Sequence, residues 1–210
     1  MFRQVPVLPV VVPLAAATLT ALLWSLARRG RFSVPRAALA LALCVYAAGI
    51  VANTVFPIFL DKPASSAAWG DHLALVPLAG YEVADAVMNI VVFVPLGMLV
   101  PLLMVRPSWS RTVAVAACVS LGIEVTQLVT AHLLGGGHLA DVNDLLFNVV
   151  GGAVGYLVLA AVTRVPRARA LVDRFRWHGT GAEGPAARDT VAPDTGPTHA
   201  PASSAARTRG

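Results

Sequence analysis

Carboxylate and amide side chains recur at helical spacing in three otherwise apolar stretches of the sequence. The three groups are Asp85 with Asn89, Glu124 with Gln127, and Asp141 with Asp144 and Asn148. Residues three, four or seven positions apart share one face of a helix, so each group should form a polar stripe. Carboxylates can transfer protons and accept hydrogen bonds, and amides can orient a polar group. These residues are the candidates for any chemistry that the protein performs.

Glu124 is the most informative candidate because it lies within a long apolar run, from Thr112 to Leu134. An ionisable group inside a membrane span costs at least about 2.5–3.5 kcal/mol and normally faces the bundle interior or a wet cavity. In an enzyme, Glu124 would act as a general acid or base, while Asp141 and Asp144 would orient the substrate or hold a divalent cation. Whether there is an enzymatic activity stays open. The alternative is a structural Glu124 that is hydrogen-bonded to a neighbouring amide.

The other polar residues also have structural interpretations. Asp141 or Asn143 could cap the helix that begins there, where a carboxylate also suits the helix dipole. Asn89, Gln127 and Asn148 could join neighbouring helices by hydrogen bonds. In the functional interpretation, these three amides would instead bind the substrate.

Glycines and prolines in the apolar runs predict how the helices pack. Gly151 and Gly155 form a small-residue face, which we expect to support a close approach of two helices. Pro95 and Gly97 could kink their helix and free a carbonyl group to line a cavity.

The sequence predicts no metal site and no cofactor. His72, His132 and His138 are near several carboxylates, but no HExxH or comparable spacing of metal ligands is present. We expect these histidines to lie in loops at the membrane interface.

Five apolar runs supply the elements that must position the candidate residues. They are Val5 to Ala27, Ala37 to Leu60, Ala86 to Val105, Thr112 to Leu134 and Leu145 to Thr163. Each is long enough to cross roughly 30 Å of hydrocarbon at about 1.5 Å per residue. The chain is 57% hydrophobic and only 13% charged, too little charge for the surface of a soluble domain. We therefore predict an all-α, polytopic membrane helix bundle with five transmembrane helices, the first becoming regular only near Pro13.

Arginines are concentrated in the segments that follow the first, third and fifth runs. They are Arg28, Arg29, Arg31, Arg36, Arg106, Arg111, Arg164, Arg167, Arg169, Arg174 and Arg176. Because positive residues favour the cytoplasmic side, we expect the N-terminus outside and the C-terminus inside a plasma membrane that the chain crosses several times. The candidate residues then lie in the outer half of the membrane. A cleaved signal peptide is the less favoured alternative, because the four arginines after the first run would have to be exported.

The net charge of +5 does not indicate a nucleic-acid-binding protein. The arginines lie in short loops and in the tail, without a basic surface interleaved with aromatic residues. Membrane lipids are the expected partners. We divide the chain into an N-terminal transmembrane helix with its basic loop (1–36), a four-helix membrane core (37–163) and a basic, largely disordered cytoplasmic tail (164–210).

The candidate residues lie in three segments of the core. They are Asn89-Ile-Val-Val-Phe-Val-Pro-Leu-Gly97, Ser120-Leu-Gly-Ile-Glu124-Val-Thr-Gln127-Leu and Asp141-Val-Asn-Asp144-Leu-Leu-Phe-Asn148-Val-Val-Gly151-Gly. In this order the segments resemble the VanZ-like family of bacterial integral membrane proteins. The segment His72-Leu-Ala-Leu-Val-Pro77-Leu is similar to a degenerate form of the family's Asn-Leu-Ile-Pro-Phe element. The resemblance covers about residues 40–162.

One departure from the family concerns substrate binding. The family usually has an arginine three residues before the first aspartate of the last motif, where this chain has His138. If that arginine contacts an anion, His138 would do so only when it is protonated. The resemblance thus adds His138 to the candidate substrate-binding residues.

The resemblance also implies a role in the cell envelope. The founding member is associated with resistance to the glycopeptide teicoplanin, whose targets are cell-wall precursors at the outer leaflet. We expect a protein that binds or modifies a lipid-linked or cell-wall-precursor group there. The alternatives are a small proton-coupled transporter that uses Glu124, and a structural membrane partner whose polar residues only lock the helices together.

Overall fold

The computed structural model describes residues 3–62, 68–78, 80–134 and 139–178. All of them belong to one compact unit, Met1–Thr180. The candidate residue His138 lies outside the described residues. So does the segment 179–210, for which the sequence predicts disorder.

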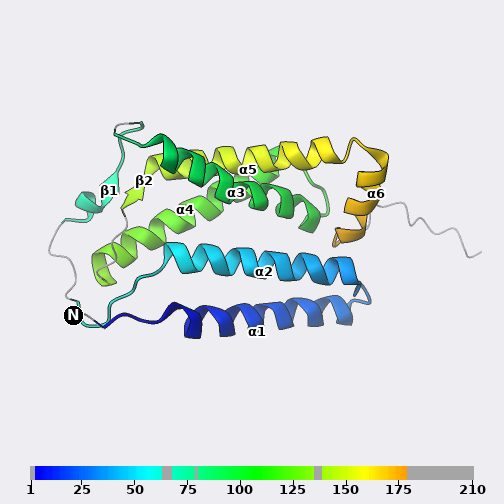
Figure 1. The fold of residues 1–210 in the computed structure, drawn as a ribbon, viewed down its shortest axis with the longest axis horizontal. Coiled ribbons are helices and arrows are strands. Elements are labelled where there is room, and N and C mark those ends of the chain that lie inside the picture. The colour runs from blue at the N-terminus through cyan, green and yellow to red at the C-terminus, as the bar shows by residue number, and fades with distance from the viewer. Residues whose placement is uncertain (1–2, 63–67, 79, 135–138, 179–210) are drawn as a thin grey trace, which may run out of the picture. The chain divides into compact units, whose positions relative to one another are not determined.

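Five long helices form the bundle that the apolar runs predict (Figure 1). They are α1 (Val7–Arg28), α2 (Val34–Thr54), α3 (Val83–Leu103), α4 (Trp109–Leu134) and α5 (Val142–Val162). Each is long and apolar enough to cross a membrane. A helix pairs its backbone groups internally, so it can cross hydrocarbon that offers no hydrogen-bond partners. The prediction of an all-α membrane helix bundle is confirmed.

Two helix ends near prolines differ from those that the sequence predicts. Helix α1 begins at Val7, so the prediction that it becomes regular only near Pro13 is wrong. Pro9 lies in the first turn, where a backbone N–H would have no helical partner, and its absence therefore costs little. Helix α2 ends at Thr54 instead of continuing to Leu60. Pro57 follows closely, and a proline restricts the residue before it to extended conformations.

The most extensive helix contact joins α3 to α5, and it depends on glycines. A Cβ atom on Gly97, Gly151 or Gly155 would clash with backbone atoms of the facing helix. The predicted close packing at Gly151 and Gly155 is therefore confirmed. Helix α3 continues through Pro95 and Pro101, and Gly97 serves this packing contact.

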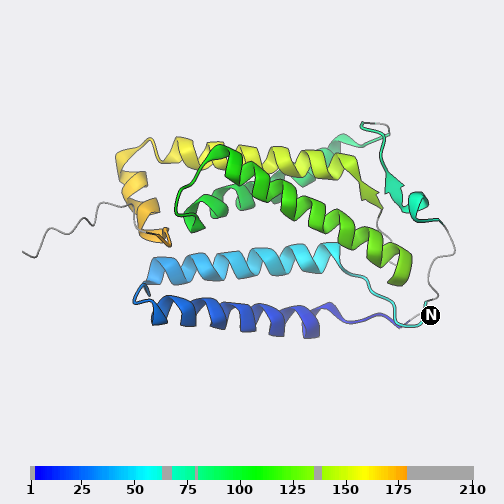
Figure 2. The same ribbon diagram turned by 180° about the vertical axis from the view of Figure 1, so that it is seen from behind.

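Helix α4 completes a three-helix core with α3 and α5. Its Ala116 packs with Phe93, Leu96 and Val100 of α3 in a buried apolar cluster. Helices α1 and α2 form a pair beside this core (Figures 1 and 2). The Tyr46 hydroxyl of α2 donates a hydrogen bond to the Val92 carbonyl oxygen of α3, 3.1 Å away.

A sixth helix, α6 (Pro166–Phe175), occupies the start of the segment that the sequence analysis assigned to the tail, and it was not predicted. Two contacts tie its end to the bundle. Arg36 Nε of α2 donates to the Arg176 carbonyl oxygen at 2.9 Å. The Trp177 backbone N–H donates to the Leu102 carbonyl oxygen of α3 at 3.0 Å.

At the opposite end of the bundle, two loops are joined by a short parallel ladder. A 3₁₀ turn, η1 (Trp69–His72), leads into β1 (Leu73–Ala74), which pairs with β2 (Ala140–Asp141). The register places Leu73 opposite Ala140 and Ala74 opposite Asp141. This ladder fixes the loop that precedes α3 against the residue that begins α5.

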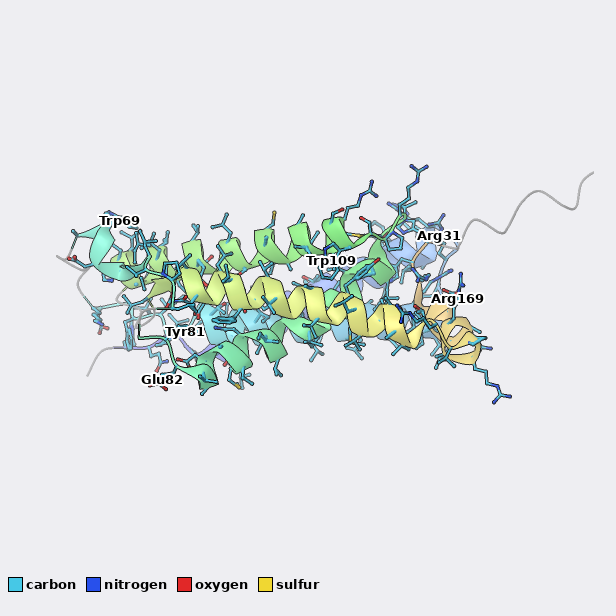
Figure 3. All side chains as sticks on the ribbon, turned by 90° about the horizontal axis from the view of Figure 1, so that it is seen from above. Arg31, Trp69, Tyr81, Glu82, Trp109 and Arg169 are labelled. Carbon is cyan, nitrogen blue, oxygen red and sulfur yellow. The ribbon has the colours of Figure 1, made fainter. Side chains whose placement is uncertain are left out.

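The two ends of the bundle carry opposite charges. Figure 3 shows Trp69, Tyr81 and Glu82 at one end and Arg31 and Arg169 at the other. We call the first the acidic end, which carries Glu82, Asp85, Asp141 and Asp144. We call the second the arginine end, which carries the loops after α1 and α3 and helix α6.

Candidate functional site

Three side chains from three parts of the chain meet at the acidic end. The Tyr81 hydroxyl, just before α3, donates a hydrogen bond of 2.5 Å to Asp144 Oδ1 of α5. Asn89 Nδ2 of α3 donates to the same carboxylate oxygen at 2.6 Å and lies 2.7 Å from the Tyr81 oxygen. Charge-assisted hydrogen bonds of this length are among the strong ones in proteins. The arrangement fixes the Asp144 carboxylate at the point where α3 approaches α5.

Tyr81 is held both by this network and by packing. Its ring stacks on Phe147, with the ring centroids 5.4 Å apart. Burial, reinforced by the hydrogen bond to the Asp144 carboxylate, raises the pKa of the Tyr81 phenol above its usual value. Tyr81 therefore remains a protonated hydrogen-bond donor over the whole neutral range.

Glu124 of α4 is directed toward the start of α5. Its Oε2 atom accepts a hydrogen bond of 2.8 Å from the Asp141 backbone N–H. The residue is only 7% exposed, and its second carboxyl oxygen, Oε1, is buried and has no partner among the described residues. Glu124 therefore uses one carboxyl oxygen to hold the Asp141 backbone, and its other oxygen is one of several buried side-chain atoms without a hydrogen-bond partner among the described residues.

Asp141 caps helix α5, which confirms its structural interpretation. Its Oδ1 atom accepts from the Asn143 backbone N–H at 2.8 Å and from Asn143 Nδ2 at 2.9 Å. Asn143 is itself buried, and its Oδ1 atom accepts from the Leu78 backbone N–H at 2.8 Å. Leu78 has a φ of +62°, an unfavourable value for leucine, so this hydrogen bond holds a strained turn in place.

Two cavities have Asp141 in their lining. The polar cavity has a volume of about 340 Å³ and is lined mainly by Tyr81, Glu82, Asp85, Asn89, Asp141 and Asp144. The apolar groove has a volume of about 180 Å³ and is lined by Leu73, Leu75, Leu121, Val125, Leu128 and Leu145, with Glu124 and Asp141 among them. The candidate acids therefore line two cavities of different polarity, and Asp141 belongs to both.

The structure separates residues that the sequence placed in one stripe. Asp144 faces α3, whereas Asn148 faces α4 and donates a hydrogen bond of 3.0 Å from Nδ2 to Ser120 Oγ. Asn148 thus makes the interhelical bond of the structural interpretation. Gln127 is buried and does not line either of the two cavities. The predicted residues that do line them are Asp85, Asn89, Glu124, Asp141 and Asp144.

Sequence reasoning missed Tyr81, which makes two of the three bonds in the Asp144 network. The available signal was its position, eight residues before Asn89 and just before an apolar run, where tyrosines commonly lie at a membrane interface. Its partner could not be inferred, because the turn between β1 and α3 determines the direction of the ring.

The histidines near the acidic end contribute to an aromatic cluster. Trp69 stacks on His132 with ring centroids 3.9 Å apart, and His72 meets the same imidazole edge-on at 5.7 Å. In the part of the chain that the structure describes, no three His, Cys, Asp or Glu side chains are placed to hold a metal ion together.

Comparison with known proteins identifies the family. The VanZ/LLP1 family model matches residues 43–163, more than half of the chain, and this range contains α3, α4, α5 and all the candidate residues. We found no match to this chain among the curated proteins or the solved structures. The matched range and the five apolar helices together show that this chain is a multi-pass membrane protein of the VanZ/LLP1 family.

Proposed function

We propose that this protein binds or modifies a lipid-linked or cell-wall-precursor group at the outer leaflet of the plasma membrane, and that it contributes to glycopeptide resistance of the teicoplanin type. The observation that carries the proposal is that Asp141 lines both the polar cavity and the apolar groove. A lipid-linked molecule has a polar and an apolar part, and the two cavities offer a polar and an apolar surrounding on either side of this residue.

The distribution of charge supports an outer-leaflet location. The arginine end should face the cytoplasm, because lysine and arginine are retained on that side of a membrane. The acidic end, with both cavities, then faces outward. This is also the side on which cell-wall precursors are assembled into the wall.

The candidate residues divide into groups with different roles. Asp144, held by Tyr81 and Asn89, would orient the polar group of the ligand in the polar cavity. Glu124, which lines the groove, would contact the ligand there. If the protein is an enzyme, Glu124 is the group placed to accept or donate a proton. Gln127 and Asn148 would support the helix packing behind the cavities.

The substitution Glu124→Gln tests the proposal. Glutamine keeps an oxygen that can accept the Asp141 N–H bond, so the fold should be retained while the carboxylate is lost. We expect the variant, at normal expression, to lose its effect on glycopeptide sensitivity and on the envelope lipid profile in a bacterial host. Asp71→Asn is the matched control, because Asp71 lies at the same end but lines neither of the two cavities.

The outcome of that experiment separates the proposal from its structural rival. If Glu124 only holds the helices together, Glu124→Gln should lower the thermal stability of the purified protein, and any loss of phenotype should follow the loss of folded protein. A folded Glu124→Gln variant with wild-type glycopeptide sensitivity and lipid profile contradicts the proposal.

A further inference from the structure

Helix α6 is held across the arginine end of the bundle (Figures 1 and 2). Only residues 163–165 separate it from α5, and a link of this length reaches roughly 10–15 Å at most. Its other end is tied to α2 by the hydrogen bond from Arg36 to the Arg176 carbonyl oxygen, and to α3 by the bond from Trp177 to Leu102. The helix is therefore kept at the level where the spans end, which is the headgroup region of a membrane.

Two exposed tryptophans indicate the same level on other helices. Trp24 lies one turn before the end of α1 and is 61% exposed, and Trp109 is the first residue of α4 and is 44% exposed. The Arg28 guanidinium lies over the Trp24 ring, 4.6 Å from the ring centroid. Tryptophans are enriched where a membrane meets water. The membrane surface should therefore pass through the arginine end, close to α6.

One face of α6 stays exposed although the helix packs against α2. Arg167, Leu171 and Arg174 share this face, at spacings of four and three residues. All three are exposed, and Leu171 is 56% exposed. A leucine between two arginines suits a membrane interface, because the leucine can enter the acyl region while the long arginine side chains reach the headgroups.

The two arginines of this face have no acidic partner among the described residues. Asp173, the one acid of α6, is already paired, 2.8 Å from Arg176 and 3.9 Å from Arg169. The neighbouring segments 29–33, 104–108 and 163–165 contain arginines and no acid. This excess of positive charge attracts anions from outside the protein. Anionic lipid headgroups are within reach, because α6 is held at their level.

We propose that the exposed face of α6 binds anionic phospholipids, with Leu171 inserted among the lipids and Arg167 and Arg174 on their phosphates. Charge complementarity and the fixed position of α6 at the ends of the spans are the grounds for it. This surface lies at the opposite end of the bundle from the two cavities. The inference is therefore independent of the proposed function, and either can fail without the other.

The first test compares lipids that differ in headgroup charge. The full-length protein is purified in detergent and titrated with dioleoyl phosphatidylglycerol, which is anionic, and with dioleoyl phosphatidylcholine, which is zwitterionic. Native mass spectrometry measures the bound lipid. We expect phosphatidylglycerol to bind at least about tenfold more tightly, because each of two arginines near a lipid surface contributes about fivefold. The preference should fall as the salt concentration rises.

Single substitutions locate the surface that binds the anionic lipid. Arg167→Gln and Arg174→Gln should each reduce the preference for phosphatidylglycerol by about fivefold. Both side chains are exposed and make no hydrogen bond with a described residue, so the fold should be retained. Arg3→Gln is the matched control, because it removes the same charge from an exposed position at the opposite end. It should leave the preference unchanged.

A second measurement tests the depth of the helix in the membrane. After Cys44 and Cys118 are replaced by alanine, Leu171→Cys is labelled with a nitroxide in vesicles of equal parts phosphatidylcholine and phosphatidylglycerol. The label should collide more often with oxygen, which dissolves in the membrane, than with a water-soluble nickel chelate. Ala170→Cys is the control, because this exposed neighbour lies about 100° away around the helix. Its label should favour the nickel chelate.

Three results would overturn the inference. The first is equal binding of the two lipids to the wild-type protein. The second is a preference for phosphatidylglycerol that neither Arg167→Gln nor Arg174→Gln weakens, because the anionic lipid would then be bound elsewhere. The third is a label at position 171 that meets the nickel chelate as often as one at position 170, because this face of α6 would then lie in water.

Discussion

Single carboxylates at the acidic end both hold the structure together and line the two cavities. Glu124 uses one oxygen to bind the Asp141 backbone, and Asp141 uses its carboxylate to cap α5. Asp144 receives two donors, from Tyr81 and Asn89. Each acid is thus positioned by a bond that does not exhaust its accepting capacity, because a carboxylate can accept about four hydrogen bonds. Each carboxylate therefore keeps further acceptor capacity.

Tyr81→Phe should destabilise the protein by about 1–3 kcal/mol, because Asp144 loses a short hydrogen bond in a partly buried place. The pKa of the Tyr81 phenol is raised in the folded protein. Its contribution to stability is therefore fully present below the pKa of an exposed tyrosine, about 10, and is lost as the pH rises through the folded value. Unfolding in detergent micelles should show the difference from wild type at pH 7 and a smaller one at strongly alkaline pH. An identical unfolding free energy for both proteins at pH 7 would contradict the network.

Ser120→Ala should weaken the contact between α4 and α5, because it leaves Asn148 Nδ2 without its acceptor. A double-mutant cycle with Asn148→Ala should give a coupling free energy of about 0.6 kcal/mol, and at most about 1.7, as for other hydrogen bonds between membrane helices. Unfolding in mixed micelles measures the four proteins of the cycle. A coupling free energy of zero would mean that the two side chains do not interact.

The sequence allowed the polar candidates to be chosen but not their pairing. An acid within an apolar run is costly, so Glu124 could be selected from its position alone. Helical spacing then placed Asp144 and Asn148 on one stripe, yet they bond to different helices. A polar stripe on α5 is wide enough to contact two neighbouring helices. Only the packing of α5 between α3 and α4 determines which helix each side chain of the stripe contacts. Tyr81 was missed because it lies in a loop. A loop has no regular spacing of residues from which the direction of a side chain could be predicted.

At the scale of elements, the α3–α5 contact depends on backbone proximity. The Gly155→Ala substitution adds a Cβ that would clash with the Val94 carbonyl oxygen, and a backbone atom cannot move aside cheaply. We expect a loss of about 1–3 kcal/mol in stability. Gly122→Ala is the control, because nothing lies near its Cβ position, and in a helix it should stabilise by about 0.5–1 kcal/mol. If the two substitutions change the free energy of unfolding in opposite directions, the result supports the close packing at Gly155. Changes in the same direction contradict it.

The helices themselves could largely be predicted, because hydrocarbon selects long apolar helices. The errors lie at their ends. Pro6, Pro9 and Pro13 suggested a late start for α1. Pro9 lies in the first turn, where its missing N–H costs little, and the helix continues through Pro13. Helix α6 was overlooked because a basic segment was taken as tail, although its apolar Leu171, Val172 and Phe175 recur at helical spacing.

For the whole molecule, the separation of charge predicts the orientation in the membrane. We expect the acidic end outside and the arginine end inside. After Cys44 and Cys118 are replaced by alanine, a single cysteine at position 71 should react with a membrane-impermeant maleimide in intact cells. A cysteine at position 29 should react only after the membrane is permeabilised. The reverse labelling pattern would contradict the orientation and the outer-leaflet assignment together.

The most direct test of the central claim is the lipid content of the protein purified from a bacterial membrane. The wild-type protein and the variants Glu124→Gln and Asp71→Asn are each purified. Mass spectrometry then compares the lipids that co-purify with each protein to the lipids of the bulk membrane. The proposed function predicts that a lipid or lipid-linked precursor is enriched with wild type and Asp71→Asn, and is lost from folded Glu124→Gln. The same lipid composition in all three preparations, equal to that of the membrane, would contradict a binding site at the acidic end.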